Sequence, residues 1–285
     1  MMKRRTMLAG AMSIALLLAG CGNTELAANN DSGHGANHAQ GDTHGGHNAE
    51  SAAPADHLKA SFAFASGSAK ANEKTEIKVR ISDKDGSPVN DFEVNHEKLM
   101  HLIVVSEDLS SFSHIHPEFK GEGTFTVPTT FLNGGKYKMF ADFKPAGGSG
   151  TTLSEWVHVE GEAAQPSAAI APDAKLVKEV GDKEIELSLS GTKANEEVTL
   201  SYDIRDAKTK EGIQNLEPYL GAVGHVVILS QDAEQYLHVH PLDEKATGPK
   251  AEFATTFPHS GIYKIWGQFQ HKGEVFTVPF VVEIK

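Results

Sequence analysis

The sequence predicts an all-β protein, in which two tandem immunoglobulin-like antiparallel β-sandwich domains follow a disordered N-terminal tether. Short runs rich in β-branched and aromatic residues recur between Gly, Pro, Asn and Asp, as at 102–105, 125–127 and 137–143. Beyond the first 57 residues, no segment keeps a convincing helical period over ten or more residues. The same part of the chain repeats itself at an offset that drifts only from 123 to 126 residues, which indicates a duplicated domain.

The N-terminus has the pattern of a bacterial lipoprotein signal peptide. A basic stretch at 3–5 precedes a short apolar run at 7–19, which ends in the lipobox-like sequence Leu-Ala-Gly-Cys21. We expect residues 1–20 to be removed and Cys21 to carry lipid, which anchors the chain outside the cytoplasmic membrane. An uncleaved anchor helix is the alternative, although about 13 apolar residues are few for a bilayer span. Either arrangement places the protein outside the cytoplasm.

Cysteine content and charge exclude several classes of function. Cys21 is the only cysteine, so the chain has no disulfide framework. Once Cys21 carries lipid it offers no thiolate, which excludes a blue-copper site. Loss of the signal peptide removes three basic residues and changes the formal net charge from −12 to −15. This acidic balance disfavours nucleic acid as a partner and suits either cation attraction or simple solubility.

Residues 21–57 are predicted to be the tether. They are rich in Ala, Asn, Gly, Ser and Asp, with too few large apolar groups to offset the entropy of ordering. Five irregularly spaced histidines lie in this segment: His34, His38, His44, His47 and His57. Such a tract either collects metal weakly without folding or is a solvated linker, and the sequence leaves both interpretations open.

The two repeats are assigned to residues 58–160 and 176–285, with a linker at 161–175. Each is long enough for one hydrophobic core. The alternation at 77–81 in the first repeat matches the alternation at 200–204 in the second. The linker contains Ala, Gln, Pro and Ser in succession.

One histidine pattern occurs in both repeats at one spacing. A lone histidine begins an apolar run, and an HxHP sequence starts 13 residues later. The histidines are His101, His114 and His116 in the first repeat and His225, His238 and His240 in the second. Imidazole nitrogen is a favoured ligand for zinc and copper, and three converging imidazoles leave an open coordination position. The pattern therefore predicts two related metal sites, one in each repeat.

A hairpin register explains how the spacing builds a site. If residues 107–110 form the first loop, Ile103 faces His114 and His101 faces His116. If residues 230–235 form the second loop, Val227 faces His238 and His225 faces His240. Because side chains alternate with period two, each set of three imidazoles projects from one face. The proline after each HxH should end the strand and leave the second histidine near an open rim. The competing interpretation is that these histidines only pack on a half-buried sheet face.

Other residues near the pattern do not repeat between the copies. Asp142 corresponds to Gln268, which is a poor match for a shared fourth ligand, and Met100 should point away from His101. Four histidines have no counterpart in the other repeat, and we therefore expect them at the surface: His96, His158, His259 and His271.

The motif sequences resemble the YtkA-like family of secreted bacterial proteins. The resemblance rests on residues 101–109 with 114–117, and on 224–230 with 237–241 and 267–271. It covers both repeats, nearly everything after the tether. It implies an extracytoplasmic β-sandwich of a kind often found beside copper-handling and heavy-metal-handling proteins, with the six motif histidines as its ligands. Met100 precedes the first upstream histidine and Gly224 the second, so the two sites need not share one affinity.

Three classes of function follow from these features. The first is a lipid-anchored protein that binds copper, or alternatively zinc, and buffers, sequesters or transfers it, with a metal transporter or another envelope protein as partner. The second is an enzyme, which we do not expect because no nucleophile, oxyanion loop or paired catalytic carboxylate stands out. The third is a non-catalytic surface interaction or spacer module whose histidines are structural.

Overall fold

The computed structural model describes residues 57–164, 170–239 and 241–285. The predicted signal peptide, residues 1–20, lies outside these ranges, as do His240 and all of the predicted tether except His57. Every regular element in the described ranges is a β-strand, so the all-β prediction is confirmed. The described residues contain no helical segment with the length and hydrophobicity of a membrane span.

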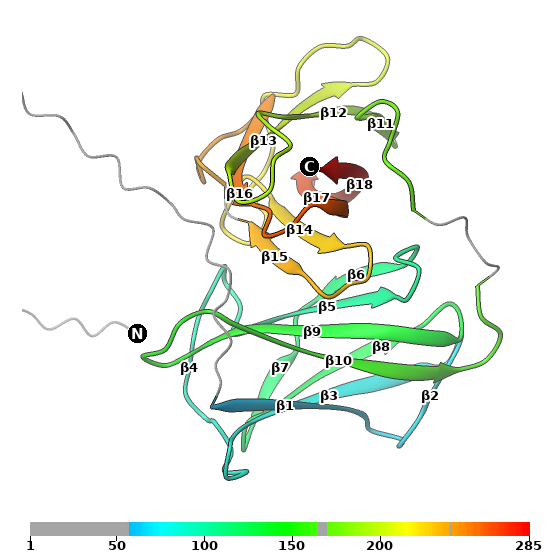
Figure 1. Ribbon diagram of the computed structural model, residues 1–285, viewed down its shortest axis with the longest axis vertical. Coiled ribbons are helices and arrows are strands. Elements are labelled where there is room, and N and C mark those ends of the chain that lie inside the picture. The colour runs from blue at the N-terminus through cyan, green and yellow to red at the C-terminus, as the bar shows by residue number, and fades with distance from the viewer. Residues whose placement is uncertain (1–56, 165–169, 240) are drawn as a thin grey trace, which may run out of the picture. The chain divides into compact units, whose positions relative to one another are not determined.

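The first repeat is an immunoglobulin-like sandwich of two sheets (Figure 1). One sheet has the order β1-β3-β8-β7, with β1 at Leu58–Phe64, β3 at Lys74–Asp83, β8 at Thr124–Thr130 and β7 at Glu118–Gly121. The other has the order β2-β10-β9-β5-β6, with β2 at Ala69–Lys70, β10 at Thr151–Glu160, β9 at Gly135–Pro145, β5 at Met100–Ser106 and β6 at Phe112–Ile115. The short β4 (Phe92–Glu93) pairs with β9, and only β2 pairs in parallel among these described strands.

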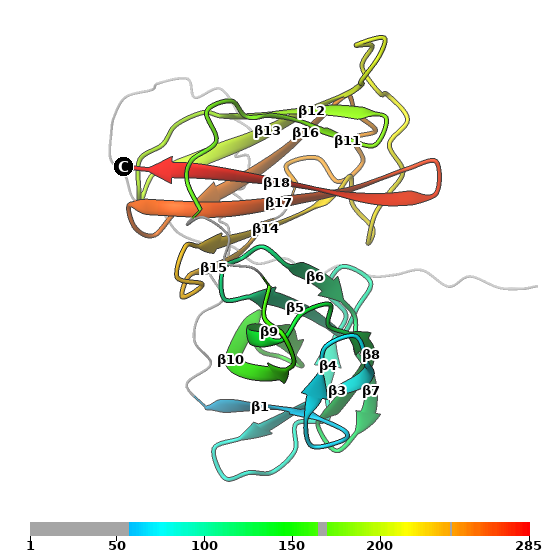
Figure 2. The same cartoon turned by 90° about the vertical axis from the view of Figure 1, so that its right-hand side faces the viewer.

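The second repeat has the same two-sheet plan, which Figure 2 shows from the side. One sheet has the order β11-β12-β13-β16, with β11 at Val177–Val180, β12 at Lys183–Leu189, β13 at Glu197–Asp206 and β16 at Lys250–Thr256. The other has the order β15-β14-β17-β18, with β15 at Tyr236–Val239, β14 at His225–Ser230, β17 at Gly261–His271 and β18 at Glu274–Ile284. The duplication inferred from the sequence is therefore a duplication of one sandwich.

Alternating side chains build the core of each sandwich. In β3, Ile77, Val79 and Ile81 are fully buried, whereas the intervening Lys78 is exposed. This period of two places one face of the strand between the sheets and the other in water. At about 25 cal/mol per Å² of apolar surface, each fully buried aliphatic side chain contributes about 1.5–3 kcal/mol. The same alternation produces the inner face of β13 in the second repeat.

Strands β5 and β14 are buried on both faces. In β5, Leu102 and Val104 belong to the sandwich core, while Ile103 and Val105 belong to a separate cluster on the opposite face. That separate cluster also contains Val227, Leu229 and Trp266 of the second repeat, and both repeats lie in one compact unit. The histidine-bearing faces of the two repeats therefore pack on each other, and we call this contact the inter-repeat face.

Equivalent residues make reciprocal contacts across the inter-repeat face. Phe112 stacks on Trp266 with ring centroids 4.7 Å apart, and Tyr236 stacks on Phe140 at 5.1 Å. Phe112 corresponds to Tyr236 in the duplication, and Phe140 corresponds to Trp266. The amino group of Lys264 donates to the Leu109 carbonyl at 2.7 Å. The two repeats thus contact each other through the same surface, as in an isologous dimer interface.

Candidate metal centre

The structure confirms the predicted register of both hairpins. Ile103 lies opposite His114 and Val105 opposite Phe112. In the second repeat, Val227 lies opposite His238. Ser230 belongs to β14 and its N–H donates to the Gln235 carbonyl at 3.0 Å, so the loop before β15 is 231–235, one residue shorter than the predicted 230–235. Strand β6 ends at Ile115, two residues before Pro117, as the missing proline N–H requires.

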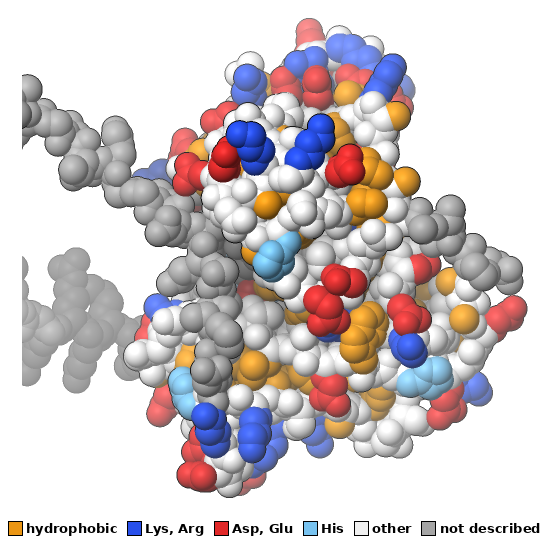
Figure 3. All heavy atoms as spheres, in the orientation of Figure 1, with side chains coloured by type: hydrophobic (Ala, Val, Ile, Leu, Met, Phe, Trp, Pro, Cys, Tyr) orange, Lys and Arg blue, Asp and Glu red, His pale blue; other side chains and the backbone are white. Residues whose placement is uncertain are grey.

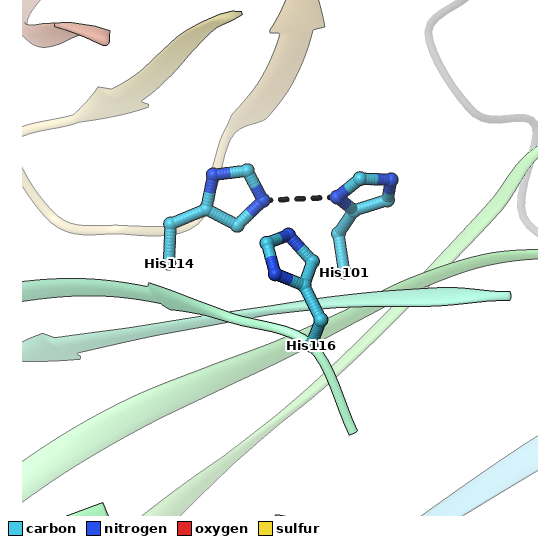
Figure 4. Close-up of side chains that lie close together, drawn as sticks. All are labelled: His101, His114 and His116. Atoms are coloured by element: carbon cyan, nitrogen blue, oxygen red, sulfur yellow. Dashed lines mark hydrogen bonds between the residues drawn. The ribbon is translucent and has the colours of Figure 1, made fainter. Parts of the chain in front are cut away.

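Three imidazoles of the first repeat converge at the end of this hairpin. One ring nitrogen from each of His101, His114 and His116 lies within 4.8 Å of the others. Figure 4 shows the His116 ring directed between the other two, with the His101 and His114 rings joined by one contact. His101 is 1% exposed, whereas His114 and His116 are partly buried. The group, which we call the triad, is therefore reached from the side of His114 and His116.

The outer ring nitrogens of two triad members are held by oxygen acceptors. His101 Nε2 lies 3.0 Å from the Asn95 carbonyl oxygen, and His114 Nδ1 lies 2.6 Å from Gln268 Oε1. Both oxygens can only accept, so both outer nitrogens carry the hydrogen. Gln268 Oε1 faces His114, while Gln268 Nε2 donates to Thr277 Oγ1 at 3.1 Å, a hydroxyl that can accept this hydrogen bond. Donation of the outer N–H to an oxygen is the arrangement that orients metal-binding histidines.

The inner nitrogens then present lone pairs to each other. In neutral imidazole only one nitrogen carries hydrogen, so His101 Nδ1 and His114 Nε2 face each other as acceptors at 2.9 Å. Two acceptors at this distance require a proton or a cation between them. Two nitrogens on one tetrahedral ion with bonds of 2.0–2.1 Å are about 3.3 Å apart. The pair therefore needs to open by only a few tenths of an ångström to hold a metal ion.

His116 supplies the third donor. Its Nε2 is buried and has no hydrogen-bond partner among the described residues. Burial first, and then the electrostatic influence of His101 and of Lys98, lowers the pKa of His116 to about 4. The neutral form with a free lone pair is the form that binds metal. An unsatisfied buried nitrogen costs about 1–3 kcal/mol, and a bound ion would remove that penalty.

The second group of predicted ligands is described only in part. His225 is 2% exposed and begins β14. The backbone of His238 lies in β15, but its side chain is outside the described part of the structure, and His240 is outside it altogether. His225 lies beside the triad, with its ring centroid 5.9 Å from that of His101 and 6.0 Å from that of His114. The described residues place His225 near the triad, and the predicted second site with His238 and His240 stays a prediction.

Several residues that the sequence placed at the surface, or set aside, lie near this centre or in the interior. His96 is partly buried and its ring lies 4.7 Å from that of His225. His271 is only 4% exposed, and its Nε2 contacts Asn215 Oδ1 at 3.2 Å, so its surface assignment was wrong. Gln268, rejected as a shared ligand, instead orients His114. The corresponding Asp142 is 4% exposed and accepts a hydrogen bond from the Tyr236 hydroxyl.

The surface around the repeats carries both signs of charge. On the face shown in Figure 3, acidic side chains are interspersed with lysines and arginines. Several of these form exposed ion pairs, such as Lys136 with Glu107 at 3.0 Å. Exposed pairs of this kind contribute about 0–1 kcal/mol, so they do not hold the triad in place.

Comparison with protein families shows where the chain belongs. A family model described as "Domain of unknown function (DUF8832)" matches residues 53–161 and again residues 178–285. The chain is a member of the DUF8832 family. Its two DUF8832 domains coincide with the two sandwiches that carry the triad and His225. The sequence has no match among curated proteins.

Comparison with solved structures gives matches at low TM-scores. The Escherichia coli adhesin FdeC has 14% identity and a TM-score of 0.26, covering 80% of this chain and 65% of its own. The Yersinia pseudotuberculosis adhesin InvE has 12% identity and a TM-score of 0.26, with coverages of 79% and 60%. Invasin, a bacterial integrin-binding protein, has 12% identity and a TM-score of 0.23, with coverages of 78% and 39%. The chain spans between 39% and 65% of these three structures, and at such scores the likeness carries no argument about function.

Proposed function

We propose that this protein is a lipid-anchored, non-catalytic metal-binding protein that acts outside the cytoplasmic membrane. The triad holds the ion, with copper(II) preferred over zinc because copper has the higher affinity for nitrogen ligands. Such a protein buffers, sequesters or transfers metal in the cell envelope, and a metal transporter or another envelope protein is its natural partner. The anchor is lipid on Cys21, and the extracytoplasmic location rests on the signal sequence.

One observation carries the metal proposal. The outer N–H groups of His101 and His114 are donated to oxygen acceptors, so their inner nitrogens point lone pairs at each other across 2.9 Å. His116 adds a buried nitrogen beside them that has no hydrogen-bond partner in the described part of the chain. A divalent cation is the ligand that satisfies three such donors at once. The net charge of −12 favours the approach of cations to the protein.

The alternative function is an interaction or spacer module with structural histidines. It draws support from the His114–Gln268 contact, which joins the two repeats without any metal. In that case the chain of hydrogen bonds from Asn95 through His101 and His114 to Gln268 would only hold the repeats together, with a proton shared between the two imidazoles.

Metal titration separates the two functions. We expect the purified chain, residues 58–285, to bind Cu²⁺ and Zn²⁺ in competition with a chelator of known affinity. His116→Ala should lower the affinity by tenfold or more, because one of three donors is lost. His158→Ala is the matched control, since His158 is exposed and distant in sequence from the triad. Equal affinities for both variants and the unaltered chain, or no binding at all, would favour the module function.

A further inference from the structure

The inter-repeat face brings a histidine of the second repeat against the triad of the first. His225 begins β14 and lies opposite Gln268 of β17 in the strand register. Gln268 in turn accepts the hydrogen bond from His114. Two neighbouring strands of the second repeat therefore contribute side chains to the surroundings of the triad. The site is not contained within one sandwich.

The ring separations can be compared with what a metal ion requires. With a metal–nitrogen bond of 2.0–2.1 Å, two imidazoles on one tetrahedral ion have ring centroids about 5 Å apart. The triad pairs are 5.1, 5.1 and 4.7 Å apart. His225 is 5.9 Å from His101 and 6.0 Å from His114. It therefore lies about 1 Å beyond this spacing, so that binding the ion would require the whole His225 side chain to move toward the triad by about that distance.

The coordination number of zinc leaves one ligand position beyond the triad, which His225 could fill. Zinc in structural sites takes four ligands in tetrahedral geometry, and the triad supplies three. The fourth coordination position would be filled by a donor atom close to the triad. His225 is only 2% exposed, and the rings of His96 at 4.7 Å and Tyr219 at 5.7 Å lie around it together with those of His101 and His114.

We propose that His225 is the fourth ligand, so that one ion is shared by the two repeats and fastens them together. This proposal rests on the metal-binding function proposed above. It assigns the chain one tight site at the inter-repeat face, in place of two independent sites of three histidines each. Bound metal then stabilises the contact between β5 and β6 of one repeat and β14 and β17 of the other.

The test compares three variants of the two-repeat chain, residues 58–285. His225→Ala removes the ligand, and His225→Gln keeps a polar side chain of similar length in case the alanine variant folds poorly. His259→Ala is the control, because His259 is an exposed histidine of the same repeat. Each is titrated with Zn²⁺ and Cu²⁺ for stoichiometry and affinity. Amide hydrogen exchange is then measured in each repeat with and without the metal.

The expected result is one tight equivalent of metal, with affinity at least tenfold lower in both His225 variants and unchanged in His259→Ala. Metal should increase amide protection in both β5 and β14. Two equivalents, of which the His225 variants lose one and keep the other at full affinity, would overturn the shared site. So would protection confined to β5 and β6. Absence of metal binding in every chain would instead refute the proposed function.

Discussion

The stacking of Phe112 on Trp266 gives a direct test of the inter-repeat face. The rings are 4.7 Å apart and inclined by 14°, although the two residues are 154 positions apart in sequence. Trp266 is 3% exposed, so Trp266→Ala should lower the free energy of unfolding by about 3–5 kcal/mol. Phe112→Ala should cost less, because Phe112 is only partly buried.

The informative quantity is the coupling between the two substitutions. An aromatic pair contributes about 0.5–1.5 kcal/mol beyond its buried area. The double variant should therefore be less destabilised than the sum of the single variants by at least that amount. Denaturant unfolding of the two-repeat chain, followed by far-ultraviolet circular dichroism, measures all four free energies.

A second cycle supplies the control. Phe253 is fully buried in the core of the second sandwich and has no ring contact with Phe112. Phe112→Ala and Phe253→Ala should be additive within about 0.3–0.5 kcal/mol. If the Phe112 and Trp266 substitutions are equally additive, the two repeats do not pack through this face, and the shared metal site loses its basis.

Three further outcomes are expected. In the same unfolding assay, Gly224→Ala should lower the free energy of unfolding by about 1–3 kcal/mol, because its Cβ would lie 2.6 Å from Phe269 Cδ1 and 2.7 Å from the Gln268 carbonyl oxygen. Gly191 has open space around it, so Gly191→Ala should leave the free energy of unfolding nearly unchanged. Burial lowers the pKa of His271, and Lys183 and Lys272 add to the effect. As the pH falls below about 6.5, the His271 imidazole is protonated more readily in the unfolded chain than in the folded one, so the free energy of unfolding decreases. His271→Gln should flatten this decrease between pH 7.5 and 5.5, and an unchanged decrease would contradict the assignment. Cys21→Ser should move the protein from the membrane fraction to the soluble fraction of the cell envelope, whereas retention in the membrane fraction would argue for an uncleaved anchor.

The hairpin registers could be predicted because strand side chains alternate strictly. With residues 107–110 as the loop, counting outward along the two strands places Ile103 opposite His114, and the structure has this pairing. The matching separation in the second repeat fixed Val227 opposite His238 in the same way. Local spacing was sufficient because a slip of one residue moves every side chain to the wrong face.

The packing of one repeat on the other could not be predicted from spacing. It depends on contacts between residues more than a hundred positions apart, and strand periodicity carries no information about them. A signal was nevertheless present, because Ile103 and Val105 share a face with His101, as Val227 and Leu229 do with His225. Four large aliphatic side chains on that face require a cover, and the other repeat provides it.

The surface assignment of His271 failed for a related reason, while His96 is partly buried. The lack of a histidine at the equivalent position of the other repeat shows only that the residue is specific to one copy. It does not show whether that residue is exposed or buried. His96 lies in the turn between Asn95 and Lys98 that leads into β5, which brings it close to the strand carrying His101. His271 ends β17, where Asn215 of a long loop covers it.

The reciprocal contacts of Phe112 with Trp266 and Tyr236 with Phe140 have a consequence for assembly. If the two repeats were separate chains, this self-complementary surface would join them only at a high protein concentration. Here both copies belong to one polypeptide, joined by the segment between Glu160 and Val177. Their encounter is intramolecular, at an effective concentration on the order of millimolar. The paired state therefore survives dilution, and its formation does not depend on how much of the protein a cell makes.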